Sequence, residues 1–158
     1  MWVAGAAAAG ALAVPAQALA DDQGVYDAWV ADDAQYAKLA KDLRQAERRW
    51  ESSGFVRAGR FLATVRHISR VVHRTKVRMS HQDPSSDQGR RAENLALRGL
   101  DLFRASILNR GRAMRAFMRF DGYNYIRLNR KSRGQLRRSA SKESQARKAF
   151  KRAGVKLK

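Results

Sequence analysis

Between residues 25 and 50 apolar residues recur at intervals of three, four or seven, the spacing of one face of an α-helix. The largest of them are seven residues apart: Trp29, Tyr36, Leu43 and Trp50. Asp22 precedes this run, and a carboxylate in that position can cap a helix. Serines and a glycine at 52–54 can end one helix and begin the next. The pattern predicts a helix over residues 25–50 with Asp22 as its cap.

Two further apolar stripes predict helices over residues 55–79 and 86–120. The first comprises Phe55, Ala58, Leu62, Val65, Ile68, Val72 and Met79. The second comprises Ala92, Leu95, Ala96, Leu100, Phe103, Ile107, Met114, Phe117 and Met118. Asp83-Pro84 excludes a continuous helix between them, and Ser85 with Gln88 fits a capping box. Because the connections are short, neighbouring helices are expected to fold back as antiparallel hairpins.

The helical pattern weakens after Asp121-Gly122, where we expect a turn or a kink. The apolar residues from 123 to 150 form only a thin stripe, and several serines and Gly134 lower the helical propensity of this segment. Residues 122–158 are therefore predicted to be a strongly basic helix or a partly disordered tail.

Together these elements predict an all-α fold, an antiparallel bundle of three to four helices built from helical hairpins. The bundle core is expected within residues 21–121, and the 158-residue chain is long enough for one domain with its own hydrophobic core. The chain has no cysteine, so its stability must come from packing rather than from disulfides.

The N-terminal segment has the pattern of a signal peptide. An uncharged apolar run at 2–14 is followed by Pro15 and by the small residues Ala18 and Ala20. This arrangement predicts a signal peptide over residues 1–20, cleaved after Ala20, and hence an exported protein of bacterial type in the envelope or the medium. The absence of a basic residue next to Met1 departs from the pattern. An uncleaved anchor and an ordinary N-terminal tail are the alternatives.

The charge is strongly positive and unevenly distributed. The chain holds 33 Lys and Arg against 14 Asp and Glu, a net charge of +19. Residues 21–52 contain five basic and eight acidic residues, a net charge of −3, whereas residues 122–158 contain thirteen basic and one acidic, a net charge of +12. A charge of this size indicates an affinity for anionic partners and does not determine the fold.

No pattern of catalysis or of metal binding is present in the sequence. His67, His73 and His81 lack the spacing of metal ligands on one helix face, and the chain has no phosphate-binding loop, dinucleotide fingerprint or nucleophile elbow. The sequence therefore predicts a protein that is not an enzyme, with no catalytic residue, metal, cofactor or small-molecule substrate.

Candidate binding residues gather in the basic C-terminal segment. The residues predicted to contact polyanions are Arg127, Arg130, Lys131, Arg133, Arg137, Arg138, Arg147, Lys148, Lys151 and Arg152. Tyr123 and Tyr125 precede them and could stack on bases, although packing of both rings on the bundle is the simpler interpretation. The last part of the segment is basic and weakly amphipathic, a pattern that can associate with an anionic membrane surface.

Three functional hypotheses follow from these features. The first is an exported helical protein whose basic surface binds polyanions of the cell envelope, such as lipid head groups or phosphate-containing polymers. The second is an intracellular protein that binds nucleic acid without sequence specificity. The third is a secreted partner-binding or inhibitor protein with an exposed apolar patch, for which Trp29 and Trp50 are the candidates.

Overall fold

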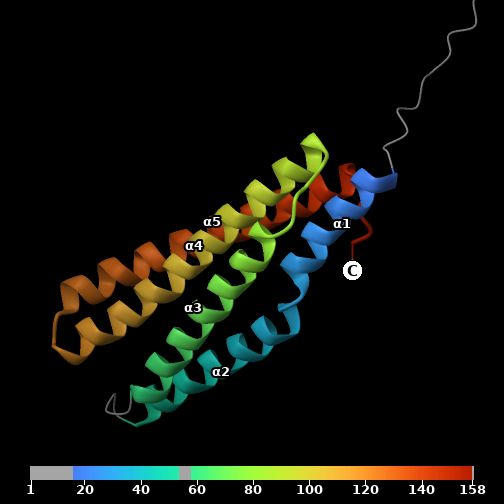
Figure 1. The fold of residues 1–158 in the computed structure, drawn as a ribbon. Coiled ribbons are helices and arrows are strands. Elements are labelled where there is room, and N and C mark those ends of the chain that lie inside the picture. The colour runs from blue at the N-terminus through green and yellow to red at the C-terminus, as the bar shows by residue number, and fades with distance from the viewer. Residues whose placement is uncertain (1–15, 54–57, 158) are drawn as a thin grey trace, which may run out of the picture.

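The protein is all-helical in the part of the chain that the structure describes. This computed structural model describes residues 16–53 and 58–157, with side chains from residue 21 onward. The helices are α1 (Ala16–Val30), α2 (Asp33–Ser52), α3 (Gly59–Ser80), α4 (Asp87–Met118) and α5 (Gly122–Arg152). They pack against one another as elongated, nearly aligned elements (Figure 1). The predicted all-α class is confirmed; the predicted start of the second helix, at 55, lies outside the described residues.

The predicted helix over residues 25–50 is in fact two helices. α1 begins ahead of Val25, and the chain breaks at Ala31-Asp32 before α2 starts. Asp32 turns its carboxylate inward, where Thr75 donates a hydrogen bond at 2.7 Å and Arg74 and Arg78 each form an ion pair at 3.2 Å. These three α3 side chains stabilise a carboxylate that would otherwise be buried unpaired. The break contains neither glycine nor proline, so the sequence gives no sign of it.

The predicted helix caps are displaced. Asp22 does not cap the first helix, because it lies inside α1; its buried carboxylate accepts hydrogen bonds from the hydroxyl and the main-chain N–H of Ser86. Ser86, not Ser85, caps α4 by accepting a hydrogen bond from the N–H of Gly89 at 2.8 Å. The capping box with Gln88 is therefore wrong by one residue. Asp22 instead links the α3–α4 loop to α1.

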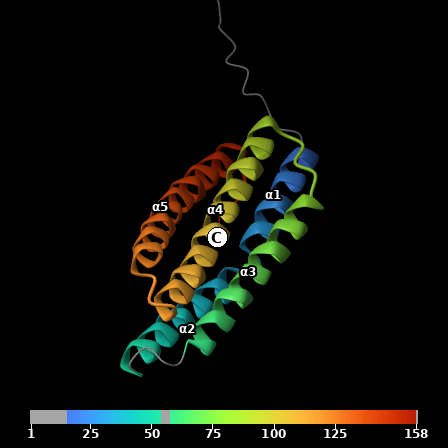
Figure 2. The ribbon, with the colours of Figure 1, turned by 90° about the vertical axis from the view of Figure 1, so that its left-hand side faces the viewer.

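α5 lies along α4 in both ribbon views, and these two helices share the most extensive interface in the described chain (Figure 1, Figure 2). The Ser139 hydroxyl donates to the carbonyl of Gly99 at 2.8 Å, and the Ser106 hydroxyl donates to that of Ser132 at 2.9 Å. One step further along, the amide of Asn109 donates to Gln135 at 2.8 Å. Polar groups buried in this interface are thus paired with one another.

Small residues spaced by seven explain this close packing. A series of buried small residues lies along each partner of this interface: Ala92, Gly99, Ser106 and Ala113 on α4, and Ser132, Ser139 and Ala146 on α5, followed by Ala153 directly after that helix. Small side chains at a helix contact permit a short distance between the helix axes. α5 therefore needs few large apolar residues, which is why its stripe looks thin in the sequence.

Aromatic contacts join the α4–α5 pair to the remaining helices. At one end Phe150 packs against Tyr26 and Trp29, with ring centroids 5.4 and 5.8 Å apart. At the other end Phe117 of α4 packs against Trp50 of α2, with centroids 5.2 Å apart. Between these two aromatic clusters, α3 contributes the buried residues Phe61, Val65, Ile68 and Val72 to the core. The core thus runs the length of the bundle and includes α5.

Candidate polyanion-binding surface

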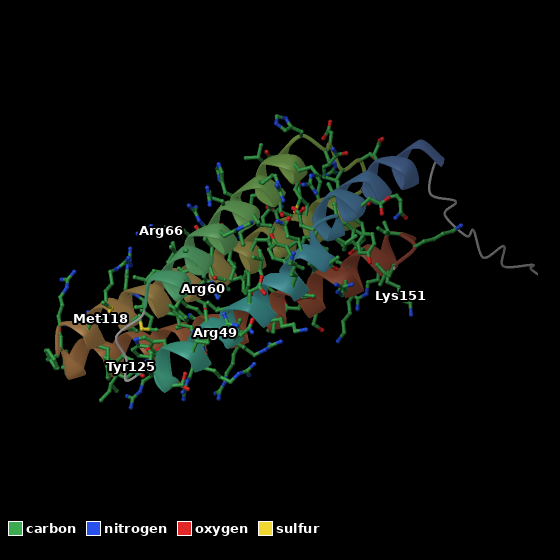
Figure 3. All side chains as sticks on the ribbon, turned by 90° about the horizontal axis from the view of Figure 1, so that it is seen from below. Arg49, Arg60, Arg66, Met118, Tyr125 and Lys151 are labelled. Carbon is green, nitrogen blue, oxygen red and sulfur yellow. The ribbon has the colours of Figure 1, made fainter. Side chains whose placement is uncertain are left out.

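Nine of the ten predicted binding residues lie on one outward face of α5. Their side chains are exposed, and their positions along the helix fall on the side opposite the small residues that pack on α4. We name this set the basic face: Arg127, Arg130, Lys131, Arg133, Arg137, Arg138, Lys148, Lys151 and Arg152. It extends from the α4–α5 turn, near Met118 and Tyr125, to Lys151 at the far end of the helix (Figure 3).

The residues of the basic face form no ion pairs within the described residues. α5 contains a single carboxylate, Glu143, which pairs with Arg147 at 3.3 Å. None of the nine residues forms an ion pair with any carboxylate that the structure describes. Exposed guanidinium and ammonium groups held along a rigid helix present a row of donors suited to phosphate oxygens.

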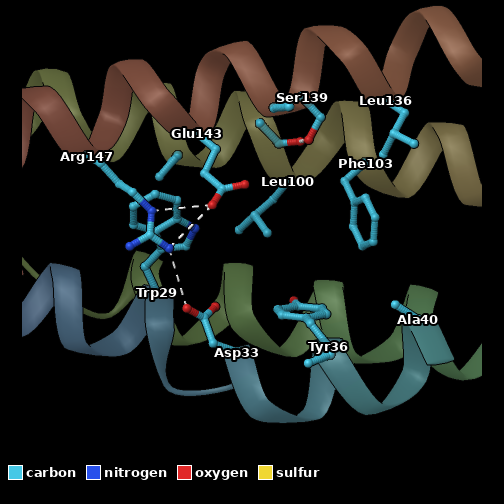
Figure 4. A pocket seen from close by; sticks show the side chains of 14 residues that line it. Trp29, Asp33, Tyr36, Ala40, Leu100, Phe103, Leu136, Ser139, Glu143 and Arg147 are labelled. Atoms are coloured by element: carbon cyan, nitrogen blue, oxygen red, sulfur yellow. Dashed lines mark hydrogen bonds and ion pairs between the residues drawn. The ribbon is translucent and has the colours of Figure 1, made fainter. Parts of the chain in front are cut away.

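Arg147, the tenth predicted residue, is oriented differently. Its guanidinium forms ion pairs with Glu143 and Asp33 and lies over the ring of Trp29, 5.3 Å from the ring centroid (Figure 4). These contacts join α5 to the start of α2 and the end of α1. Arg147 is therefore a bridging residue between helices, set apart from the basic face.

The ion-paired Arg147 closes one end of a groove of about 450 Å³ between α2 and α5. Its walls are largely apolar and include Tyr36 of α2, Phe103 of α4 and Leu136 of α5 (Figure 4). Burial raises the pKa of Asp33, Arg147 opposes that rise, and the neighbouring Glu143 carboxylate adds to it. The groove contains no arrangement of nucleophile, base and orienting group that would indicate catalysis.

A second surface feature lies where α4 turns into α5. Four large apolar side chains between residues 118 and 126 are exposed: Met118 by 46%, Phe120 by 97%, Tyr123 by 77% and Ile126 by 61%. We name them the apolar tip. The prediction placed Met118 on the packed face of its helix, and this is wrong. The sequence could have indicated the tip, because Phe120 and Tyr123 flank a turn in which few core neighbours are within reach.

The two tyrosines considered for base stacking have different environments. Tyr125 packs against Phe117, with ring centroids 5.2 Å apart, whereas Tyr123 is exposed beside the start of the basic face. Trp29 and Trp50 are both buried, so they do not form the exposed patch considered for a partner-binding protein. The exposed apolar surface lies at the tip instead.

Other kinds of site are not evident in the described residues. Within residues 16–53 and 58–157, no group of three or more His, Asp or Glu side chains is placed to hold a metal ion. No helix in the same ranges combines the length and the apolar character needed to cross a membrane. The predicted cleavage-site residues Ala18 and Ala20 lie in α1, at positions whose side chains the structure does not describe.

Comparison of the chain with protein-family models, with curated proteins and with solved structures found no match.

Proposed function

We propose that this chain is an exported, non-enzymatic helical protein that binds anionic phosphate-bearing polymers or lipid head groups of the cell envelope through the basic face of α5. The observation that carries the proposal is the row of nine exposed basic side chains with no carboxylate paired to them among the described residues. In this proposal the helices form an antiparallel bundle of hairpins, and its basic C-terminal helix is the binding element.

The distribution of charge across the molecule supports this assignment. The acidic residues of the first part of the chain lie on α1 and α2 and in the break between them, where Asp32 pairs inward with Arg74 and Arg78. The positive charge of α5 is thereby left facing solvent on one side. An anionic surface would meet this side first, because charge asymmetry orients a protein as it approaches.

The fold is compatible with removal of a signal peptide after Ala20. The described contacts that hold α1 come from residues beyond that point: Asp22 bonds to Ser86, and Val25, Tyr26 and Trp29 are buried in the core. A chain beginning at Asp21 keeps all of them. We expect the protein recovered from its host to begin at Asp21 and to lie outside the cytosol, whereas a cytosolic chain that retains Met1 would contradict export.

Nucleic acid is the second candidate partner, and one observation favours it. Tyr123 is exposed next to Arg127, and an aromatic ring beside a guanidinium can stack on a base while the charge contacts phosphate. This function predicts tighter binding to single-stranded DNA than to anionic vesicles. The substitution Tyr123→Ala should then lower the affinity for single-stranded DNA.

Charge neutralisation on two helices tests the proposed binding face. The triple variant Arg127→Gln, Arg130→Gln, Arg133→Gln removes three charges from the basic face. Each charge near an anionic membrane is worth about 1 kcal/mol, so affinity for phosphatidylglycerol vesicles should fall roughly a hundredfold. The control variant Arg44→Gln, Arg48→Gln, Arg49→Gln removes the same charge from exposed positions of α2. Equal losses in both variants would show that net charge, and not this face, governs binding.

A further inference from the structure

The backbone at Phe120 adopts a conformation that is unfavourable for its residue type. Phe120 has φ of 60°, and it is the one described non-glycine residue with a positive φ. It follows the last turn of α4, where its N–H bonds to the carbonyl of Phe117 and the next N–H, of Asp121, bonds to that of Ala116. This pair of bonds is a Schellman motif, and glycine is the usual residue at its left-handed position.

Packing of the Phe120 side chain does not compensate for this unfavourable backbone conformation. It is 97% exposed, the highest value among the exposed large apolar side chains. Neither local conformation nor burial in the fold accounts for a phenyl ring here. Strained positions of this kind gather at functional sites, so an interaction outside the described residues is the physical explanation that remains.

Cationic side chains surround the apolar tip. Arg115 on α4, Arg119 directly after that helix, and Arg127 and Arg130 on α5 are exposed, and none of them forms an ion pair with a described carboxylate. Asp121, in the turn itself, caps α5: its carboxylate accepts hydrogen bonds from the main-chain N–H of Asn124 at 3.0 Å and from the side-chain amide of Asn124 at 2.6 Å, while Arg127 and Arg119 attract it without forming an ion pair. The tip is thus apolar at its end and positively charged behind it.

The spacing along α5 matches the layers of a bilayer surface. Counted from the start of the helix, Tyr123 and Ile126 lie within about 6 Å of the tip, and Arg127 and Arg130 lie about 8 and 12 Å behind it. Apolar side chains of interfacial segments reach about 5–10 Å into the boundary between head groups and acyl chains, while basic groups stay at the phosphates. The turn is a protruding end of a hairpin, which suits a deformable lipid surface.

We propose that the α4–α5 tip inserts Met118, Phe120, Tyr123 and Ile126 into the interface of an anionic phospholipid bilayer, with the surrounding arginines on the lipid phosphates. The inference rests on the proposed function, because the positive charge of the basic face attracts the protein to the surface, and the arginines nearest the tip then contact the phosphates as the tip inserts. It adds a contact that salt cannot screen, and it selects membranes among the possible polyanions.

Site-specific labelling of the full chain tests insertion, and the absence of cysteine makes labelling selective. The variant Phe120→Cys carries an environment-sensitive dye at the tip. The control variant Ser85→Cys carries the same dye just before the start of α4, about 48 Å from the tip along this 32-residue helix. Every variant keeps the apolar run 2–14, so the contribution of that segment to the overall affinity for vesicles is the same in each. With phosphatidylglycerol vesicles we expect a blue shift and a gain in intensity at 120 and no change at 85.

The second measurement compares Phe120→Gly with the unchanged protein. Glycine relieves the backbone conformation, so the variant should fold normally, which thermal unfolding checks. Loss of the phenyl ring should lower affinity for the vesicles about tenfold at high salt, while affinity for polyphosphate changes less than twofold.

Four results would overturn insertion. Vesicle binding without a dye response at 120, or binding to polyphosphate without binding to vesicles, overturns the tip proposal and leaves the basic face intact. A dye response and an affinity loss for single-stranded DNA as large as those for vesicles would assign the tip to base stacking. Absence of binding to both vesicles and polyphosphate would overturn the proposed function, and the tip proposal with it.

Discussion

Phe120 holds at the end of α4 the position that Gly154 holds at the end of α5. Both follow the last helical residues with a positive φ, 60° for Phe120 and 84° for Gly154. At Gly154 the motif is complete, because the next residue, Val155, is buried with Phe150 and donates its N–H to the Phe150 carbonyl at 3.1 Å. At Phe120 the next residue is the polar Asp121. The chain thus places its glycine at the end that packs and an aromatic ring at the end that protrudes.

This contrast predicts opposite effects of exchanging the two residue types. Phe120→Gly should raise the free energy of unfolding by about 0.5–1 kcal/mol, since relief of the left-handed conformation outweighs the added freedom of the unfolded chain. Gly154→Ala introduces a Cβ at a residue whose φ is 84°, and it should lower the free energy of unfolding by about 1 kcal/mol or more. Chemical denaturation of both variants measures the difference. A destabilising Phe120→Gly would show that the ring contributes to the fold.

Two glycines of α4 provide a second matched pair. A Cβ on Gly89 would overlap the buried carboxylate of Asp22, which bonds to Ser86. Gly89→Ala should therefore destabilise the protein by about 1–3 kcal/mol. A Cβ on Gly99 would lie 3.5 Å from the Cβ of Lys142, which is an ordinary contact.

Gly99→Ala should consequently be neutral, or stabilise by up to about 1 kcal/mol through helical propensity. Thermal unfolding of the two variants side by side checks this. Equal destabilisation would contradict the packing described for the α1–α4 and α4–α5 contacts.

Two carboxylates should give opposite dependence of stability on pH. Burial raises the pKa of Asp33 above its ordinary 3.8, so the folded state favours its protonated form. The contribution of Asp33 to stability therefore falls as pH rises through the window above 3.8. Hydrogen bonds from Asn124 lower the pKa of Asp121 below 3.8, so its contribution is present above that pH and lost as pH falls through the lowered value.

The corresponding amide variants measure these contributions. We compare the free energy of unfolding of each variant with that of the unchanged protein. For Asp33→Asn this difference should be more stabilising near pH 7 than near pH 3. For Asp121→Asn it should be more destabilising near pH 7 than near pH 3. Urea unfolding at both values gives the comparison. The same sign for both variants would show that one of the two environments is described incorrectly.

The fold should survive removal of the predicted signal peptide. Deleting residues 1–20 leaves Asp22 and the buried side chains of Val25, Tyr26 and Trp29 in place, so the free energy of unfolding should change by less than about 1 kcal/mol. Deleting residues 1–30 removes them and should destabilise the protein by about 5 kcal/mol or more. A large loss from the shorter deletion would mean that the first twenty residues belong to the folded domain.

The sequence predicted the helical class and most helix ends, because those depend on local periodicity and on Pro84 and the serines beside it. It did not predict the break at Asp32, since that break depends on Arg74, Thr75 and Arg78 from a distant helix. It also missed the interface of α5. The small residues Ser132 and Ser139 carry no hydrophobic signal until their partners on α4 are known.

The candidate site was predicted in part, for a similar reason. Nine basic residues lie exposed as their spacing suggests, whereas Arg147 is engaged by Asp33, a residue over a hundred positions earlier in the chain. Phe120 is exposed because no element among the described residues packs over the turn, and periodicity contains no information on that. Long-range contacts thus determine which charged and apolar side chains remain available for binding.

The central claim is that the exposed charge of α5 binds anionic phosphate surfaces, and a salt titration of the full chain with vesicles tests it most directly. We predict binding to vesicles containing phosphatidylglycerol at about 50 mM salt, a steep loss of affinity by about 500 mM, and little binding to pure phosphatidylcholine at either concentration. Equal binding to both kinds of vesicle, or no binding at low salt to either the anionic vesicles or polyphosphate, would contradict it.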